Sequence, residues 1–381
     1  METMKELGLY LHIPFCKRKC NYCDFCSFPG QSQEIVDAYI DRLCRDLKEA
    51  KSSAAGYTVD SVYIGGGTPT TLTPSQFEKI GEALHASYSF ADDLEFTVEC
   101  NPATGSPELF RALRETGANR VSVGLQSIHQ NELSALGRIH GSKEFYKTFD
   151  ELQKAGFSNI GADLMFGIPN QTVESYFETL KAVTALPLTH LSSYNLILEE
   201  GTPFWTMQKD LPLPNENDER KMYLTGIDFL ADHGFHQYEI SNFAKEGYES
   251  RHNLKYWNGE PFLGFGLAAY SDFGGERKGN SRDLAAYLRG ENIVASSETL
   301  STDERAEEYV MLKMRTADGV SIEVLRERYG AIFANRIASG LAKYLDKGLV
   351  KATKEGFSFT PEGFFVSNSI LSDLLLFGQT S

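Results

Sequence analysis

Four of the six cysteines lie within eleven residues, and this cluster is the part of the 381-residue chain best suited to chemistry. Cys16, Cys20 and Cys23 form a Cys-x3-Cys-x2-Cys pattern directly after an apolar run at residues 9–13. Three thiolates on one loop can bind three irons of a cubane iron–sulfur cluster and leave the fourth iron open to another ligand. These three cysteines are therefore the expected metal ligands.

A structural zinc site with Cys26 as the fourth ligand is the alternative interpretation of the same loop. Zinc sites usually pair two Cys-x2-Cys knuckles across a longer loop, and four cysteines in one short loop fit that arrangement poorly. Cys26 is therefore expected to be dispensable. The basic residues 17–19 lie between the cysteines and are expected to favour the thiolate form. Cys44 and Cys100 stand alone, as buried apolar cysteines usually do.

The elements that must position this loop follow a regular pattern from the start of the chain to about residue 200. Strands are expected at residues 9–13, 61–64, 94–99, 120–124, 160–165 and 191–196. Helices are expected at residues 34–50, 74–88, 107–116, 143–155 and 173–186. Strands that alternate with helices indicate βαβ units and a parallel sheet. Six such units predict an α/β fold with an open or partial barrel, whose functional residues lie at the C-terminal ends of the strands.

Polar residues end or follow several of these strands. They are Gly66, Gly67, Thr68, Glu99, Gln126 and Arg138. Three of these features have an ordinary alternative: a tight turn for the glycine run, a solvated end residue for Glu99, and a surface ion pair for Arg138. Asp163 lies inside an apolar strand, where an unpartnered charge would be costly, so it is expected to face a ligand.

The pattern changes near residue 210. After a Leu-Pro-Leu-Pro break at residues 211–214, the sequence predicts a helix at 216–233, a strand at 237–241 and a glycine-rich stretch at 259–279. The last 80 residues are expected to be mainly helical, with a hairpin near 350–360 that suggests a winged-helix-like module. We therefore expect a barrel at 1–210, an extension at 211–290 and a mixed, mainly helical C-terminal domain at 291–381.

The charge balance argues against several classes of partner. The formal net charge is −15, whereas nucleic-acid binding needs a basic stripe and a polybasic membrane anchor needs clustered lysines. No apolar run approaches the roughly 18 residues of a membrane-spanning helix. Residues 1–8 do not form a signal peptide. A cytoplasmic protein without nucleic-acid or membrane partners is therefore expected.

Several motifs resemble those of the radical S-adenosylmethionine (SAM) superfamily, in the order found in its oxygen-independent coproporphyrinogen III oxidase-like family. They are YLHIPFC at 10–16, GGGTPT at 65–70, ECNP at 99–102, GLQS at 124–127, GRIH at 137–140 and DLMFGIP at 163–169. The resemblance covers nearly the whole chain. It implies a partial (β/α)6 barrel and a [4Fe-4S] cluster on the three cysteines. It also implies that SAM is bound by Tyr10, Tyr22, Gly66, Gly67, Thr68, Glu99, Gln126, Arg138 and Asp163.

Three departures separate this chain from the oxidases of that family. Phe25 stands where they have a further cysteine, only 15 residues precede Cys16, and residues 238–244 differ from their signature. The stretch at 252–257, His-Asn-Leu-Lys-Tyr-Trp, instead resembles the H-N-x-x-Y-W motif of the HemW-type heme chaperones. That resemblance implies heme contact through His252. The structural alternative is that His252 caps a loop while the aromatic residues pack in the core.

The resemblance implies a protein that binds heme and passes it to an acceptor protein, with a SAM and cluster site fed by an electron donor such as a flavodoxin or ferredoxin. The alternative is a radical SAM enzyme that decarboxylates the propionate side chains of coproporphyrinogen III. A third and weaker interpretation is a radical SAM methyl- or alkyltransferase. Cys26 also departs from the heme-chaperone pattern, which often has Asn at this position.

Overall fold

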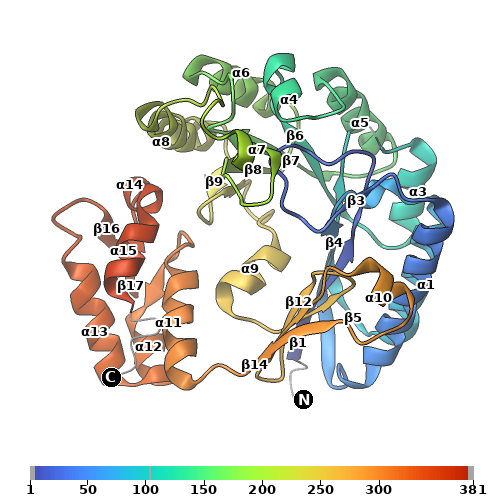
Figure 1. The fold of residues 1–381 in the computed structure, drawn as a ribbon. Helices are drawn as coiled ribbons and strands as arrows, with labels where there is room; N and C mark the ends of the chain where they lie inside the picture. The colour runs from blue at the N-terminus through green and yellow to red at the C-terminus, as the bar shows by residue number, and fades with distance from the viewer. Residues whose placement is uncertain (1–4, 103, 376–381) are drawn as a thin grey trace.

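The computed structural model describes residues 5–102 and 104–375, and its centre is a curved 12-stranded sheet. Six parallel strands form the middle of the sheet in chain order: β1 (Lys5–Ile13), β4 (Tyr57–Gly66), β5 (Phe90–Cys100), β6 (Arg120–Gln126), β7 (Asn159–Phe166) and β8 (His190–Asn195). The helices between them cover the outer face (Figure 1): α1 (Gln33–Glu49), α2 (Pro74–Ser87), α3 (Pro107–Glu115), α4 (Gln130–Ala135), α5 (Ser142–Lys154) and α6 (Val173–Thr184). The predicted partial barrel is confirmed.

The sequence signals for helix starts hold in the structure. Thr73 caps α2 through a reciprocal capping box with Gln76, and Pro74 occupies the first helical turn. Ser106 caps α3 with a single bond, in which its hydroxyl accepts the backbone N–H of Leu109. These caps satisfy backbone donors that the helix itself leaves without partners, so the helices begin where the sequence predicts.

The extension after residue 210 adds strands to both edges of the barrel sheet. At one edge β11 (Phe262–Phe265) pairs parallel to β1, and β12 (Tyr270–Phe273), β13 (Glu276–Asn280) and β14 (Val294–Glu298) continue antiparallel. At the other edge β10 (Asn242–Ala244) pairs antiparallel to β8, followed by β9 (His236–Gln237). The glycine-rich stretch therefore forms strands of the barrel sheet, and the boundaries at 210 and 290 stay predictions.

The strand expected at 237–241 is wrong. β9 ends at Gln237 and β10 begins at Asn242, so the apolar-looking stretch between them is a turn. Glu239 bridges instead to Thr316, and Tyr238 accepts the backbone N–H of Ala317. The pairing partner that draws this segment away from the strand comes from a distant part of the chain, which local pattern could not reveal.

The C-terminal part of the chain forms a separate lobe on the opposite side of α9 from α1 (Figure 1). In chain order it contains α11 (Thr302–Lys313), β15 (Val320–Ser321), α12 (Ile322–Tyr329), α13 (Ala331–Ala342), β16 (Val350–Ala352), β17 (Gly356–Phe359), α14 (Pro361–Phe365) and α15 (Ser367–Leu374). β15, β17 and β16 make a three-stranded antiparallel sheet. This order agrees with the expected winged-helix-like module, and the predicted hairpin is confirmed.

Between the barrel and this lobe lie α8 (Glu216–Asp232) and α9 (Arg251–Asn258). Ser250 caps α9, and Gly259 ends it at a φ of 65°, where glycine avoids the strain of a side chain. α9 packs on both β4 and α11. The remaining short elements are β2 (Phe15–Cys16), β3 (Phe28–Pro29), η1 (Ala50–Ser52), η2 (Pro69–Thr71), α7 (Pro203–Met207) and α10 (Leu284–Leu288).

The barrel strands alternate between an apolar outer face and a polar inner face. On β4, Val62 and Ile64 are fully buried in the hydrophobic core, whereas Ser61 and Tyr63 point to the inside and contact α9. The same alternation places Arg120 and Ser122 of β6 inside the barrel. Polar side chains do not form a hydrophobic core, so the polar interior of the barrel is a candidate ligand site.

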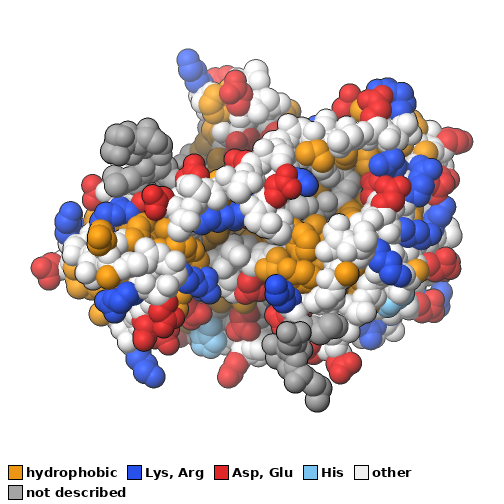
Figure 2. Space-filling model, turned by 90° about the horizontal axis from the view of Figure 1, so that it is seen from below, with side chains coloured by type: hydrophobic (Ala, Val, Ile, Leu, Met, Phe, Trp, Pro, Cys, Tyr) orange, Lys and Arg blue, Asp and Glu red, His pale blue; other side chains and the backbone are white. Residues whose placement is uncertain are grey.

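The molecular surface carries charges of both signs. On the face seen from below, Lys and Arg side chains are scattered among Asp and Glu side chains (Figure 2). Within the described residues, none of the helices is both long enough and apolar enough to cross a lipid bilayer.

Candidate functional site

The three predicted cluster ligands line one cavity of about 350 Å³ at the C-terminal ends of the barrel strands. Cys16 belongs to β2, and Cys20 and Cys23 follow on the loop. The Cys16 thiol lies 3.4 Å from the Thr68 hydroxyl, and Arg138 donates to the Cys20 sulfur at 3.7 Å. The loop is held against the barrel by Asn21, which donates to two backbone carbonyls at the C-terminal end of α4.

The donor set fits a cubane cluster. A single metal ion needs its ligands to converge on one point, and no group of three or more His, Cys, Asp or Glu side chains does so in the part of the chain described. In a cubane cluster each thiolate binds a different iron, so three separated half-buried thiols suit it. Cys26 is buried and does not line the cavity, so the geometry gives the zinc alternative no support.

Burial, more than the neighbouring cations, sets the pKa of two thiols of the loop. Burial raises the pKa of Cys23 to about 11 and raises that of Cys16 above its usual value. The charge of Lys19 lowers the pKa of Cys23 by less than burial raises it, and the Lys19 ammonium donates to the carbonyl of Phe25. Lys19 therefore acts on Cys23 in the expected direction, but desolvation outweighs its charge.

The glycines at the C-terminal end of β4 are required by the fold itself. Gly66 has a φ of 110°, and a Cβ there would lie 2.5 Å from the ring of His12. A Cβ on Gly67 would lie 2.8 Å from the carbonyl oxygen of Phe15. Both glycines also line the cavity. The tight turn that requires glycine therefore also exposes backbone to a ligand in the cavity.

Two carboxylates face the cavity from strands β5 and β7, which flank β6. Glu99 accepts bonds from the Tyr63 hydroxyl at 2.8 Å and from the Gly66 backbone N–H at 3.1 Å. Burial, and then the charge of Asp163, raise the pKa of Glu99 to about 7. Asp163 accepts bonds from the hydroxyls of Ser122 at 2.9 Å and Ser192 at 2.8 Å. The hydrogen bonds to Asp163 offset the free-energy cost of burying its charge. Together with those to Glu99, they hold both carboxylates toward the cavity.

Gln126 and Arg138 stand on a strained part of the cavity rim. β6 carries an irregularity between Gly124 and Gln126, and Gln126 has a φ of 72°, which non-glycine residues rarely adopt. Such strain is kept where the surrounding structure enforces it, often at ligand sites. Arg138 donates to the Gly124 carbonyl as well as to the Cys20 sulfur, so its guanidinium links the strand to the cysteine loop.

Eleven of the thirteen residues predicted as ligands line this cavity: Cys16, Cys20, Tyr22, Cys23, Gly66, Gly67, Thr68, Glu99, Gln126, Arg138 and Asp163. Tyr10 does not. Its hydroxyl donates to His12 Nδ1 at 3.0 Å, and His12 Nε2 donates to the Cys26 carbonyl at 2.8 Å. Tyr10 therefore supports the cysteine loop through His12 in this arrangement.

Sequence reasoning missed several further cavity residues. They include Tyr63, Asn101, Arg120, Ser122, His190, Ser192, Tyr194 and Asn253. Most are polar residues at alternate positions of apolar strands, as in His190, Ser192 and Tyr194 on β8. That period-two signal was present in the sequence, and it indicates a polar inner face.

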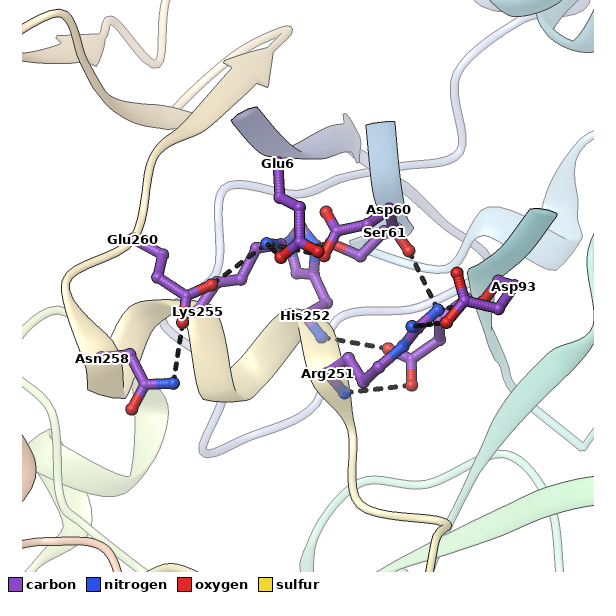
Figure 3. Close-up of polar contacts among 10 residues, drawn as sticks. Glu6, Asp60, Ser61, Asp93, Arg251, His252, Lys255, Asn258 and Glu260 are labelled. Carbon is purple, nitrogen blue, oxygen red and sulfur yellow. Dashed lines mark hydrogen bonds and ion pairs between the residues drawn. The ribbon is translucent and has the colours of Figure 1, made fainter. Parts of the chain in front are cut away.

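His252 lies outside the cavity, on the side of α9 that packs against the barrel strands (Figure 3). Its Nδ1 is 3.0 Å from the Ser61 hydroxyl and its Nε2 is 2.8 Å from the Tyr256 hydroxyl. The ring also stacks on Tyr63 at 5.3 Å, and the residue is 1% exposed. Burial, followed by the charge of Lys255, lowers the pKa of His252 to about 3.

Charged contacts hold α9 in this position. Glu95 of β5 accepts the backbone N–H groups of Arg251 and His252, both at 3.0 Å, so its carboxylate caps the start of the helix. Lys255, 2% exposed, reaches Asp60 at 2.7 Å and Glu260 at 3.1 Å (Figure 3). In this conformation His252 does not fit the role of an axial heme ligand, because both of its imidazole nitrogens are hydrogen-bonded within the protein. Heme contact through His252 stays a prediction that requires α9 to move.

Comparison with known proteins agrees with the fold and the cysteine loop. Residues 10–183 match the family model described as the Radical SAM superfamily, and residues 300–366 match the HemN C-terminal domain. The solved structure of coproporphyrinogen III oxidase (HemN) from Escherichia coli, described as a radical SAM enzyme, superposes with a TM-score of 0.86. It is 24% identical, and the match covers 98% of this chain and 91% of that chain. Barrel, cysteine loop and cavity together define a radical SAM protein.

Curated relatives narrow the family. The heme chaperone HemW of Bacillus subtilis is 36% identical over 96% of this chain and 98% of its own length. The proteins of the same name from Lactococcus lactis and Escherichia coli are 33% and 30% identical, each over 98% of their own length. The chain belongs to the HemW family of heme chaperones.

Proposed function

We propose that this protein is a cytoplasmic heme chaperone, which binds heme and passes it to an acceptor protein. The observation that supports this most strongly is the 36% identity to a curated heme chaperone over nearly the full length of both chains. The likeness to the oxidase structure concerns the fold, at 24% identity, and does not favour decarboxylation of coproporphyrinogen III.

The proposal includes a [4Fe-4S] cluster held by Cys16, Cys20 and Cys23, and SAM in the adjoining cavity. When bound, the cluster supplies a single electron to SAM, received from a donor such as a flavodoxin or ferredoxin. The protein's own part is to bind and orient the cofactors and to keep water from them. The half-buried cysteines and the converging polar groups of the cavity support that assignment.

Individual cavity residues suit separate parts of SAM. Arg138 can pair with a carboxylate through its planar fork, and Glu99 and Asp163 can accept from amino or hydroxyl groups. The backbone N–H of Gly66 is already bonded to Glu99, so that carboxylate is preorganised before a ligand arrives. Tyr22, Gly67, Thr68 and Gln126 complete the proposed contacts from the loop and the rim.

Heme binding and decarboxylation can be separated in one anaerobic experiment. The reconstituted protein is titrated with hemin and, in parallel, supplied with coproporphyrinogen III, SAM and a one-electron reductant. We expect saturable heme binding, a Soret band distinct from free hemin, and no loss of carbon dioxide. Turnover of coproporphyrinogen III without stable heme binding would overturn the proposal and favour the oxidase.

A further inference from the structure

The cavity extends one inward-facing strand position below Glu99 and Asp163, two of the residues assigned to SAM. Its floor is formed by Arg120, the first residue of β6, His190, the first residue of β8, and Asn253 of α9. Along β6, Arg120 precedes Gly124 by four residues, or roughly 13 Å of strand. The floor is therefore a second polar layer, separate from the rim where Arg138 contacts Gly124.

Arg120 is a buried cation that makes no direct ion pair within the described residues. It is 1% exposed, its Nη1 donates to the Thr97 hydroxyl at 3.3 Å, and its Nε has no partner among the described residues. Across that same part of the chain its guanidinium forms no ion pair. Burying such a charge is costly unless it is paired. Arg120 faces the cavity, where its charge acts on Glu99 without a direct ion pair between the two side chains. The missing partner is therefore expected to be an anionic group of a ligand.

His190 supplies a neutral donor beside this cation. Burial, and then the charge of Arg120, lower the pKa of His190 well below its usual range, so the imidazole stays neutral. Its Nε2 lies 2.8 Å from the Tyr238 hydroxyl, and its Nδ1 has no partner in the described chain. When Nε2 accepts the Tyr238 proton, the ring's own N–H is at Nδ1 and is free to donate. His190 is 1% exposed and lines the cavity.

The third floor residue belongs to the helix that carries His252. Asn253 lines the cavity from α9, whereas its neighbour His252 is bonded to Ser61 and Tyr256 away from it. An amide can donate to an anion without adding charge. The motif that suggested a heme ligand thus presents its asparagine, not its histidine, to the cavity.

We propose that Arg120, His190 and Asn253 form a carboxylate-binding subsite at the floor of the barrel. One guanidinium with two neutral donors matches a monoanion. A phosphate dianion would leave negative charge near Glu99 and Asp163, which already face the same cavity. Resting on the proposed function, the carboxylate is a propionate side chain of heme, which reaches the floor while the macrocycle stays nearer the mouth.

A test of the subsite itself does not need heme. The holoprotein is heated in sodium propionate, in propionamide, and in sodium chloride of equal ionic strength. Propionate at ten times its Kd should raise the Tm by roughly 1–2 °C, and neither control should. No difference between propionate and the controls would overturn the subsite, and this measurement needs no variant.

Variants then assign the effect to its residue. Arg120→Met should abolish the propionate shift while SAM affinity stays within twofold, and Arg120→Lys should keep part of the shift. Arg315→Met is the matched control, because Arg315 is a partly buried arginine bonded to Asn368 outside the cavity. A full propionate response in Arg120→Met would overturn the assignment.

A second arm identifies the ligand. Hemin should bind at least tenfold more tightly than hemin dimethyl ester, and Arg120→Met should bind both alike. If propionate stabilises the protein but hemin does not bind, the subsite stands and the proposed heme function fails. Equal affinity of the unmodified protein for hemin and its ester would overturn the assignment of the carboxylate to heme.

Discussion

Replacement of Lys255 by Met should loosen α9 from the barrel. The Lys255 ammonium lies 2.7 Å from a carboxylate oxygen of Asp60, and both side chains are buried. The other Asp60 oxygen has no partner among the residues described. Met keeps the packing of the lysine stem but leaves the Asp60 carboxylate buried without its counter-charge.

The expected loss is large because the pair is shielded from water. Removing one partner of a buried ion pair typically costs about 3–5 kcal/mol. Glu260 and Glu6 also approach Lys255, but their side chains are 38% and 69% exposed, so they stay hydrated when it is removed. A loss of about 3 kcal/mol corresponds to a rise of roughly 150-fold in the population of the opened helix.

Hydrogen–deuterium exchange of the amides at 251–258 measures that opening directly. We expect exchange in Lys255→Met to be about 100-fold faster than in the unmodified protein. Lys79→Met is the matched control, because Lys79 pairs with Asp41 at the surface and the change should cost less than about 1 kcal/mol. The double variant Asp60→Asn with Lys255→Met should recover most of the protection, because no unpaired charge remains.

The same variants test whether heme reaches His252 by opening of α9. If it does, hemin uptake should be faster in Lys255→Met than in the unmodified protein or in Lys79→Met. Exchange at 251–258 within threefold of the unmodified protein in Lys255→Met would refute the reasoning about the buried pair, and so would fast exchange that Asp60→Asn does not slow. Faster exchange with unchanged heme uptake would refute the link to His252.

Four further outcomes follow from the site. Cys26→Ser should keep about four irons and four sulfides per chain after anaerobic reconstitution, and Cys16→Ser should lose them; the reverse result would contradict the ligand assignment. Asp163→Ala should weaken SAM binding by about 1–3 kcal/mol in equilibrium titration, and unchanged affinity would remove Asp163 from the site. His252→Ala should shift the Soret band and reduce heme retention without changing iron content; an unaltered spectrum would favour a purely structural role. Because the closed helix holds the His252 pKa at about 3 and an exposed histidine has one near 6.5, the open form binds more protons in acid. The free energy of opening should therefore fall by about 1.4 kcal/mol per pH unit between about pH 6 and 5, and His252→Gln should remove that slope in exchange at 251–258.

Local and sequential features of this protein were predictable from its sequence. The order of strands and helices in the barrel follows from hydrophobic periodicity and from caps such as Thr73, which act within a few residues of each other. The cysteine loop follows from spacing alone, since Cys16, Cys20 and Cys23 must lie near one another on so short a segment. Parallel strands bring their C-terminal ends to one edge, so Glu99 and Asp163 were expected to meet, and both line the cavity.

Features that depend on distant parts of the chain were decided only by the tertiary structure. Whether His252 faces a ligand or the protein depends on Ser61, which is 191 positions away, and on the burial that α9 acquires when it packs on β4. Likewise, the absence of a direct ion pair to Arg120 depends on where the folded chain places its carboxylates. Sequence determines which groups a segment carries and their local spacing. Burial and pairing of those groups are properties of the assembled fold, because desolvation and ion pairing depend on what the rest of the chain brings within a few ångströms.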